Sequence, residues 1–189
     1  MARYQAGIRT EARIIEATRA LLGEAGLEGT TLKAICERAG VRAGSFYNLF
    51  GSKEEAVMRV VREAIRAVDP DPEGAGTDTV PELVEAYARF IVDQPVVARI
   101  YVQIAVTGGL TDPSTARRFL RHHIRRVERL ADAFTRSDPG MRDDVARARA
   151  EVLVATLNGL AFRWALQPGF DFRAHLDEAL NAEAGLTGW

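Results

Sequence analysis

Apolar residues recur at every third or fourth position along most of the chain, which is the spacing of an α-helix. The first such stripe lies between Thr10 and Gly26, and it consists of Ile14, Ile15, Thr18, Leu21, Leu22 and Ala25. No segment shows the convincing alternation of apolar and polar residues that a half-buried strand requires. The pattern therefore predicts an all-α fold of about nine helices.

Residues that start or stop helices divide the first 68 positions into four helices. The residues with the character of N-caps are Thr10, then Thr30 or Thr31, and finally Ser52 with Glu55 as a capping box. Gly26 is predicted to end the first helix and Gly40 the second. A short third helix follows Gly40, and the fourth runs to residue 68.

A segment rich in Pro, Asp and Gly, residues 69–78, cannot continue a helix and marks the best domain boundary. Five helices are predicted after it, at about 79–93, 95–108, 112–138, 141–166 and 171–184. The helix at 95–108 is unusually apolar, so we expect it to pass through the middle of this part of the chain. The predicted domains are therefore a head (1–51), a connecting helix (52–68) and a body (79–189).

Residues 41–53, Val-Arg-Ala-Gly-Ser-Phe-Tyr-Asn-Leu-Phe-Gly-Ser-Lys, carry the most specific signal in the chain. They follow the helix that Gly40 closes, and together these segments have the order helix, glycine turn, short helix. This is the helix-turn-helix pattern, in which the second helix enters the major groove of DNA. Small residues at the start of that helix allow it to lie close to base edges.

The same stretch resembles the DNA-binding signature of TetR-family transcriptional regulators. The matching positions are Thr30, Thr31, Leu32, Ile35, Glu37, Arg38, Ala39, Gly40, Val41, Gly44, Tyr47, Phe50 and Lys53. The resemblance covers roughly residues 10–61, about a quarter of the chain. It implies a three-helix DNA-binding head joined to a helical body that binds a ligand and forms a dimer.

The resemblance also implies roles for individual residues of the head. Thr31, Tyr47 and Lys53 occupy positions that contact phosphate in the family. The residues expected at base edges are Ser45 and Asn48, with Arg42 and Ala43 as further candidates beside the small Gly44. Asn can pair with adenine through two hydrogen bonds. Phe46 and Phe50 are predicted to be core residues.

Two positions depart from the family pattern. Arg42 stands where a capping serine is common, so the third helix loses that cap and gains a cation that can bind phosphate or guanine. Leu49 stands where an aromatic residue or histidine often contacts phosphate. Because of these departures, the DNA sequence that this protein binds cannot be inferred from the operators of other family members. The alternative for the whole motif is a capped, solvated helical hairpin.

The charge of the chain is uneven, which suits a DNA-binding head on a different body. Residues 1–66 hold 11 Lys and Arg against 8 Asp and Glu, a net charge of +3, whereas residues 67–189 hold 14 against 18, a net of −4. Cys36 is the single cysteine, so no disulfide can form within the chain. With no signal peptide and no apolar run of 18 residues, we expect a soluble, cytoplasmic protein without membrane contact.

A short recognition helix gives little affinity alone, so we expect a homodimer on a palindromic double-stranded operator. From residue 152 to 166 the predicted helix is apolar on nearly all sides, with interruptions at Thr156, Asn158, Gly159 and Arg163. Such a helix must be buried on two sides, against its own domain and against a partner. The last helix could complete a four-helix interface through Phe172, Leu176, Ala179 and Leu180.

The family resemblance implies a pocket for a small-molecule effector in the body. The candidate lining residues are Phe90, Tyr101, Gln103, Phe119, His123, Asn158, Phe162 and Trp164, and ordinary core packing is the alternative for each. Their character predicts a largely apolar effector. An anionic effector is the alternative, because the helix at 112–138 also carries Arg117, Arg118, Arg121, Arg125, Arg126 and Arg129, which otherwise form a solvated basic face.

Catalysis and cofactors find no support in the sequence. It shows no nucleophile–base pair, no metal-ligand spacing and no glycine-rich phosphate loop, and the adjacent His122 and His123 diverge by about 100° on a helix. We therefore predict a non-enzymatic regulator without cofactor or metal, a repressor released from its operator by an effector. The alternatives are a constitutive regulator without effector and a small helical enzyme or carrier.

Overall fold

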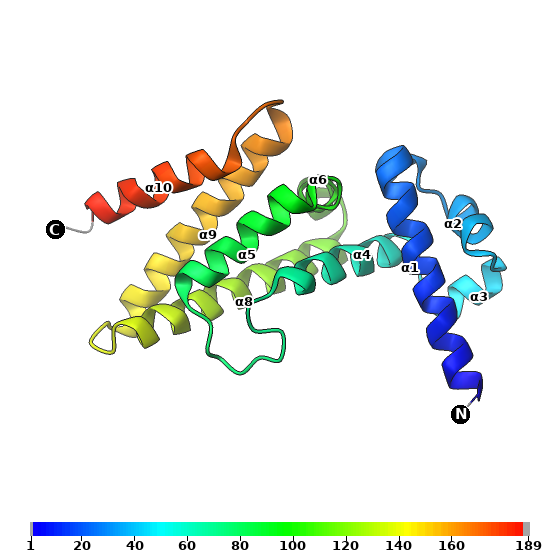
Figure 1. Cartoon of the computed structure of the whole chain (residues 1–189), viewed down its shortest axis with the longest axis horizontal. Coiled ribbons are helices and arrows are strands. Elements are labelled where there is room, and N and C mark those ends of the chain that lie inside the picture. The colour runs from blue at the N-terminus through cyan, green and yellow to red at the C-terminus, as the bar shows by residue number, and fades with distance from the viewer. Residues whose placement is uncertain (1, 187–189) are drawn as a thin grey trace. The chain divides into compact units, whose positions relative to one another are not determined.

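The computed structural model describes residues 2–186, so Met1 in the predicted head and residues 187–189 in the predicted body lie outside the described residues. The chain forms two compact units. The N-terminal unit extends to Ala67 and includes Val96–Tyr101; the C-terminal unit comprises Val68–Pro95 and the residues from Val102 onward. The helices of five or more residues are α1 (Ala2–Gly29), α2 (Leu32–Ala39), α3 (Ala43–Tyr47), α4 (Lys53–Val68), α5 (Val80–Asp93), α6 (Pro95–Gln103), α8 (Pro113–Ser137), α9 (Asp143–Leu166) and α10 (Phe172–Leu186) (Figure 1).

The prediction of an all-α chain with about nine helices is confirmed, since residues 2–186 contain no strand. In the N-terminal unit, α1 to α4 enclose an apolar core. Its fully buried side chains include Ile14, Leu22, Ile35, Phe46, Val57, Val60 and Val61. Phe46 and Phe50 are both buried, with ring centroids 5.5 Å apart, as the sequence predicted. This core fixes α3 against its neighbours despite its length of five residues.

The start of the first helix was predicted wrongly. The helix begins at Ala2, not at Thr10, and the Thr10 hydroxyl donates to the Ala6 carbonyl at 2.8 Å inside the helix. A threonine can bond to the carbonyl four residues earlier as well as cap a helix, so its identity alone did not fix the boundary. At Gly26, the predicted end, a φ of 65° kinks the helix, and helical residues continue beyond it to Gly29.

In the C-terminal unit, α8 and α9 pack side by side, and α5 and α10 also pack in this unit (Figure 1). Core side chains come from each of the four helices, and they include Ile91, Val127, Leu130, Val154, Leu157, Phe172 and Leu176. Helix α5 begins with a capping box, in which Thr79 and Glu82 bond to each other's backbone N–H groups. The Thr79 N–H donates to Glu82 Oε2 at 2.8 Å, and the Glu82 N–H donates to Thr79 Oγ1 at 3.4 Å.

The apolar segment after Pro95 differs from its prediction. Instead of one helix to residue 108, α6 ends at Gln103 and is followed by a π-helical turn, Ile104–Gly108, and the three-residue α7, Gly109–Thr111. The Thr107 hydroxyl donates to the Gln103 carbonyl at 2.7 Å, and such back-bonding bends helices. Val96–Tyr101 belongs to the N-terminal unit, so the prediction that this segment crosses the middle of the body is wrong.

The loop at 69–78, predicted as the boundary, is ordered by a chain of Asp and Arg side chains. The Asp71 carboxylate accepts from the N–H groups of Ala75 and Gly76 at 2.8 and 2.6 Å. Arg129 on α8 donates to Asp69 at 2.6 and 3.1 Å and also to Asp78. The hydrogen bond from Arg129 lowers the pKa of Asp69. The loop that follows α4 is thereby fixed to α8.

Candidate DNA interface

The turn between α2 and α3 has the geometry that a helix-turn-helix requires. Gly40 ends α2 in the left-handed conformation, with φ 62° and ψ 41°, which glycine adopts at little steric cost. The Ala34 N–H donates to Thr31 Oγ1 at 3.1 Å, so Thr31 is the cap at the start of α2. Arg42 precedes α3 without a side-chain cap, as predicted from its departure from the family pattern.

Burial separates the residues of α3 into one anchor and an exposed surface. Phe46 is fully buried, as predicted, whereas the predicted DNA-contacting positions of this segment are exposed: Arg42, Ala43, Gly44, Ser45, Tyr47 and Asn48. Tyr47 is 56% exposed, and its ring meets the edge of Phe46 with centroids 5.8 Å apart. Because Phe46 is held in the core, the Tyr47 ring that contacts it is held in place with its hydroxyl toward solvent. Helix α3 therefore presents small and polar side chains to solvent while Phe46 fixes the helix to the core.

The remaining two predicted phosphate contacts lie at the starts of α2 and α4. Thr31 is exposed, and although its oxygen accepts the capping bond, its O–H remains able to donate. Lys53 is half-buried, with Nζ at 3.4 Å from the Leu27 carbonyl oxygen and 4.0 Å from Glu54 Oε1. The Lys53 amine therefore already has two oxygen partners within the protein.

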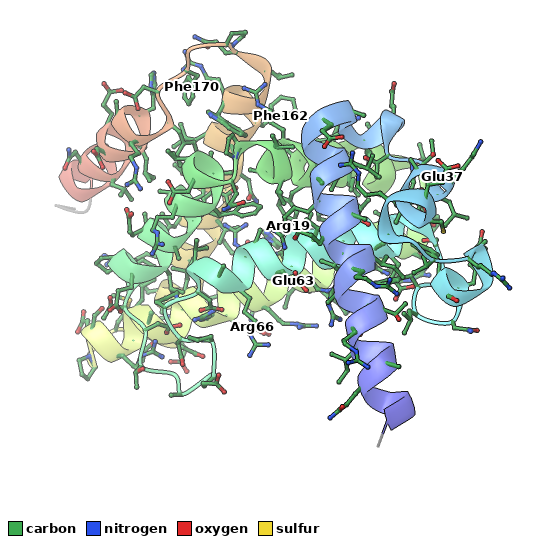
Figure 2. The ribbon with its side chains drawn as sticks, turned by 45° about the vertical axis from the view of Figure 1, so that its right-hand side comes forward. Arg19, Glu37, Glu63, Arg66, Phe162 and Phe170 are labelled. Carbon is green, nitrogen blue, oxygen red and sulfur yellow. The ribbon has the colours of Figure 1, made fainter. Side chains whose placement is uncertain are left out.

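Three arginines of the N-terminal unit pair with carboxylates of other helices. Arg19 of α1 and Glu63 of α4 face one another at 3.0 Å (Figure 2). Arg38 makes two hydrogen bonds to Glu24, at 2.6 and 2.7 Å, and they lower the pKa of that carboxyl. Arg59 Nη2 lies 2.7 Å from Glu11. These pairs join helices within the unit.

The eight candidate ligand-lining residues differ in burial. Phe90 and Trp164 are buried; Tyr101, Phe119 and His123 are half-buried; Gln103, Asn158 and Phe162 are exposed. Tyr101 belongs to the N-terminal unit and the other seven to the C-terminal unit. His123 Nε2 lies 3.2 Å from Glu151 Oε2, which joins α8 to α9.

Two side chains contact Asn158: Tyr87, which the sequence reasoning missed, and Arg126, which it named only as part of a basic face. Arg126 donates to Asn158 Oδ1 at 3.0 Å, and its guanidinium lies 4.5 Å from the centroid of the Tyr87 ring. Burial raises the pKa of the Tyr87 hydroxyl, which is 3.5 Å from the same Asn158 oxygen. Tyr87 stands one position before the buried Ala88, and Arg126 one before the buried Val127. In the sequence, the only indication that these two side chains are partly buried is their position next to the apolar stripe of each helix.

Helix α9 has two opposite apolar faces, as the sequence predicted. The buried face consists of Ala146, Ala150, Leu153, Val154, Leu157, Ala161 and Trp164. The exposed face, here called the α9 seam, consists of Val145, Ala148, Val152, Ala155, Gly159, Phe162 and Leu166. Its members alternate at spacings of three and four residues. On α10, by contrast, Phe172 and Leu176 are buried within the single chain, so they are not free for a partner.

Among the residues that the structure describes, no three His, Cys, Asp or Glu side chains are grouped so that they could hold a metal ion. No single helix of that part of the chain has the length and apolar character to cross a membrane, although the bent pair Val80–Asp93 and Pro95–Gly108 passes on length and composition.

The N-terminal part of the chain matches a family model. Residues 14–58 fit the model of bacterial regulatory proteins, tetR family. The matched segment includes all of α2 and α3 and the start of α4. It therefore contains every residue proposed to contact DNA: Thr31, Arg42, Ala43, Gly44, Ser45, Tyr47, Asn48 and Lys53.

Curated relatives match over most of the chain. The HTH-type transcriptional regulator BetI of Burkholderia thailandensis is 31% identical over 172 residues, which cover 87% of each chain. The protein of the same name from Burkholderia mallei is 30% identical over 161 residues, or 82% of this chain and 81% of the relative. The similarity therefore extends through both compact units.

Solved structures share the fold. A transcriptional regulator from Rhodococcus sp. Rha1 superposes with a TM-score of 0.68 and 24% identity over 93% of this chain and 94% of its own. SmeT, the repressor of the Stenotrophomonas maltophilia multidrug efflux pump SmeDEF, gives a TM-score of 0.64 and 22% identity over 91% and 89%. Taken with the helix-turn-helix geometry, the family model and the full-length relatives lead to one conclusion: the chain belongs to the TetR family of bacterial regulatory proteins and is a DNA-binding transcriptional regulator.

Proposed function

We propose that this regulator is a homodimeric repressor that leaves a palindromic operator when a small-molecule effector binds its C-terminal unit. It acts by binding DNA, not by catalysis, and its place of action is the cytoplasm. The observation that carries the proposal is α3, a short helix that exposes small and polar residues while Phe46 anchors it to the core. The curated relatives support it, because they are named as transcriptional regulators and the similarity covers most of their length.

The proposed DNA contacts divide by chemistry. Thr31, Tyr47 and Lys53 bind phosphate, which supplies affinity that does not depend on sequence. Ser45 and Asn48 contact base edges, and Arg42 binds guanine or phosphate. Ala43 and Gly44 matter because they are small. A Cβ on Gly44 would meet nothing within 4 Å, so the protein itself does not require glycine there, whereas close approach to DNA does.

The proposed dimer forms through the α9 seam. A stripe with three- and four-residue spacing is the pattern that packs against a second helix. Val152, Phe162 and Leu166 are 55%, 46% and 66% exposed in the single chain, which is unusual for so long a row of apolar side chains. Helix α10 contributes from its outward side, because Phe172 and Leu176 pack inside their own chain.

The proposed effector site lies in the C-terminal unit. Phe90, Phe119, His123 and Trp164 are the candidates there that retain a buried or half-buried position. The effector is largely apolar, and an anionic group would bind the exposed arginines of α8. Binding shifts a population between two states, so the effector must have different affinities for the DNA-binding and released forms. Helix α4 leads directly into the loop that Arg129 fixes to α8 by hydrogen bonds, and this connection could transmit the shift.

Selection of genomic fragments by the purified protein tests the proposal. Recovered fragments should share a palindrome, and the adjoining genes would indicate the chemical class of the effector. The matched control is Gly44→Glu, because open space around Gly44 lets the variant fold while its carboxylate blocks approach to DNA. The variant should enrich nothing. If the unmodified protein enriches no sequence above random DNA, the proposal fails.

A further inference from the structure

Six arginines of the N-terminal unit fall into two groups. Arg19, Arg38 and Arg59 pair with carboxylates of other helices. Arg9, Arg13 and Arg42 are exposed, and within the described part of the chain none of the three lies within ion-pair distance of a carboxylate. Of these three unpaired arginines, Arg9 and Arg13 lie on α1, and Arg42 is the residue that precedes α3.

The carboxylates nearest to Arg13 in sequence are engaged elsewhere. Glu11 pairs with Arg59 of α4 at 2.7 Å, and Glu16 lies 3.8 Å from Arg19. Since neither acid lies within ion-pair distance of Arg13, its charge is not compensated by its own helix. A guanidinium in this position retains its full attraction for an external anion.

The position of Arg13 connects it with the helix-turn-helix. Its Nη1 lies 3.9 Å from the place that a Cβ on Gly40 would occupy. Gly40 ends α2, and two residues later Arg42 leads into α3. The Arg13 guanidinium therefore lies beside the turn, next to the N-terminal end of the recognition helix. Arg9 stands one helical turn before Arg13, on the same face of α1.

We propose that Arg13 and Arg9 are phosphate-binding residues, which extend the DNA interface from the helix-turn-helix onto α1. The inference rests on the proposed function, because it assumes that α3 enters the major groove. With α3 in the groove, a cation beside the turn faces the sugar–phosphate backbone at the groove's edge. Arginine suits this contact because its planar fork donates two parallel hydrogen bonds to phosphate oxygens.

The test is the salt dependence of binding, measured with the full-length protein on selected DNA and on random duplex. Each phosphate contact adds about 0.9 to the slope of log affinity against log salt. A dimer carries two copies, so Arg13→Gln should lower the slope by about 2, and Arg9→Gln with Arg13→Gln by about 4. The affinity should fall by similar factors on both DNAs. Arg13→Lys should restore part of the slope.

Arg149→Gln is the matched control, because Arg149 is exposed on α9 and its loss changes the net charge equally. It should leave the slope unchanged. Thermal melting should be the same for all variants, since these side chains are exposed. An unchanged slope for Arg13→Gln, or a loss confined to the selected sequence, overturns the inference. If the unmodified protein selects no sequence, the proposed function fails, while the slope on random duplex still decides whether α1 binds phosphate.

Discussion

At the scale of the residue, Asn48 is the position where specificity is best tested. It is exposed at the C-terminal end of α3, and its amide can form two hydrogen bonds with adenine. We predict that Asn48→Ala costs about 1–3 kcal/mol on selected DNA and relaxes the preference at one base pair. Tyr47→Phe and Lys53→Ala should weaken binding to all sequences alike. Titration of both DNAs distinguishes these outcomes, and equal losses for Asn48→Ala would exclude it as a base contact.

His122 provides a second prediction, for the pH dependence of stability. Burial, with help from the charges of Arg126 and Arg125, lowers the pKa of His122 from 6.5 to about 4. Between these values the unfolded chain binds a proton that the folded chain does not, so stability falls as pH decreases from 6.5 to 4. We predict a loss of about 1–3 kcal/mol across this range from this residue.

Urea unfolding at pH 7, 5.5 and 4.5 measures the effect. His122→Gln cannot titrate, so its stability should decline less than that of the unmodified protein over the same interval. Carboxylates with lowered pKa, such as Asp69, lose their contribution at more acidic pH and affect both proteins equally. Parallel curves for the two proteins would show that His122 titrates normally in the folded state.

Local sequence was sufficient for some residues and not for others. Gly40 could be assigned as the end of α2 and its start narrowed to Thr30 or Thr31, because a cap depends on neighbours within four positions; the structure shows that Thr31 is the cap. The pairing of Arg38 with Glu24 could not be predicted, since the two are 14 residues apart and meet only when α1 and α2 pack. For the same reason the sequence alone does not separate Arg13, which has no such partner, from Arg38.

At the scale of the element, the chain of Asp69, Arg129, Asp78 and Arg136 determines how the loop after α4 lies on α8. The Asp78 side chain is 1% exposed, so its charge depends on these two arginines. We predict that Arg129→Gln costs about 2–4 kcal/mol, because one partner of a buried carboxylate is removed. Arg125→Gln, an exposed arginine one turn earlier, should change stability by less than about 0.5 kcal/mol. Chemical unfolding of both variants gives the comparison, and equal midpoints would contradict the prediction.

The α9 seam gives a prediction about assembly. Ala155 lies near the middle of the seam and is exposed in the single chain. We predict that Ala155→Glu produces a monomer, because a dimer through the seam would bury an unpaired carboxylate in each subunit. Light scattering across a range of concentrations measures the mass. Ala12→Glu is the matched control, an exposed alanine on α1 that should leave a dimer intact. A dimeric Ala155→Glu would place the subunit interface elsewhere.

Two strongly apolar segments differ in how well the sequence predicted them. The two apolar faces of α9 follow from a stretch that is apolar all round, because no other arrangement buries it. The segment after Pro95 has the same apolar character, yet it breaks into α6, a π-helical turn and α7. Composition favoured one continuous helix and did not indicate the break, within which the Thr107 and Thr111 hydroxyls donate to carbonyls four residues earlier.

At the scale of the whole molecule, the proposals about DNA and about assembly depend on each other. Contacts from α3 alone are few, so affinity requires two copies held at a fixed separation. The α9 seam lies in the C-terminal unit and the helix-turn-helix in the N-terminal unit, so dimerisation and DNA contact are on separate parts of the chain. Variants that separate the subunits should therefore bind DNA weakly while their helix-turn-helix remains folded.

This dependence leads to a prediction about the operator. Two recognition helices related by a two-fold axis contact half-sites about one helical turn apart. Inserting about 5 base pairs between the half-sites moves one of them to the opposite side of the duplex, so a rigid dimer contacts only the other. We predict that affinity falls by about 100-fold or more, to the level of a single half-site.

The measurement is titration of the natural and the expanded palindrome, with a palindrome that lacks one half-site as the reference. The Ala155→Glu monomer should bind all three alike, because it has no second subunit to place. Equal affinities of the dimer for the natural and expanded sites would mean that the two subunits are not held at a fixed separation.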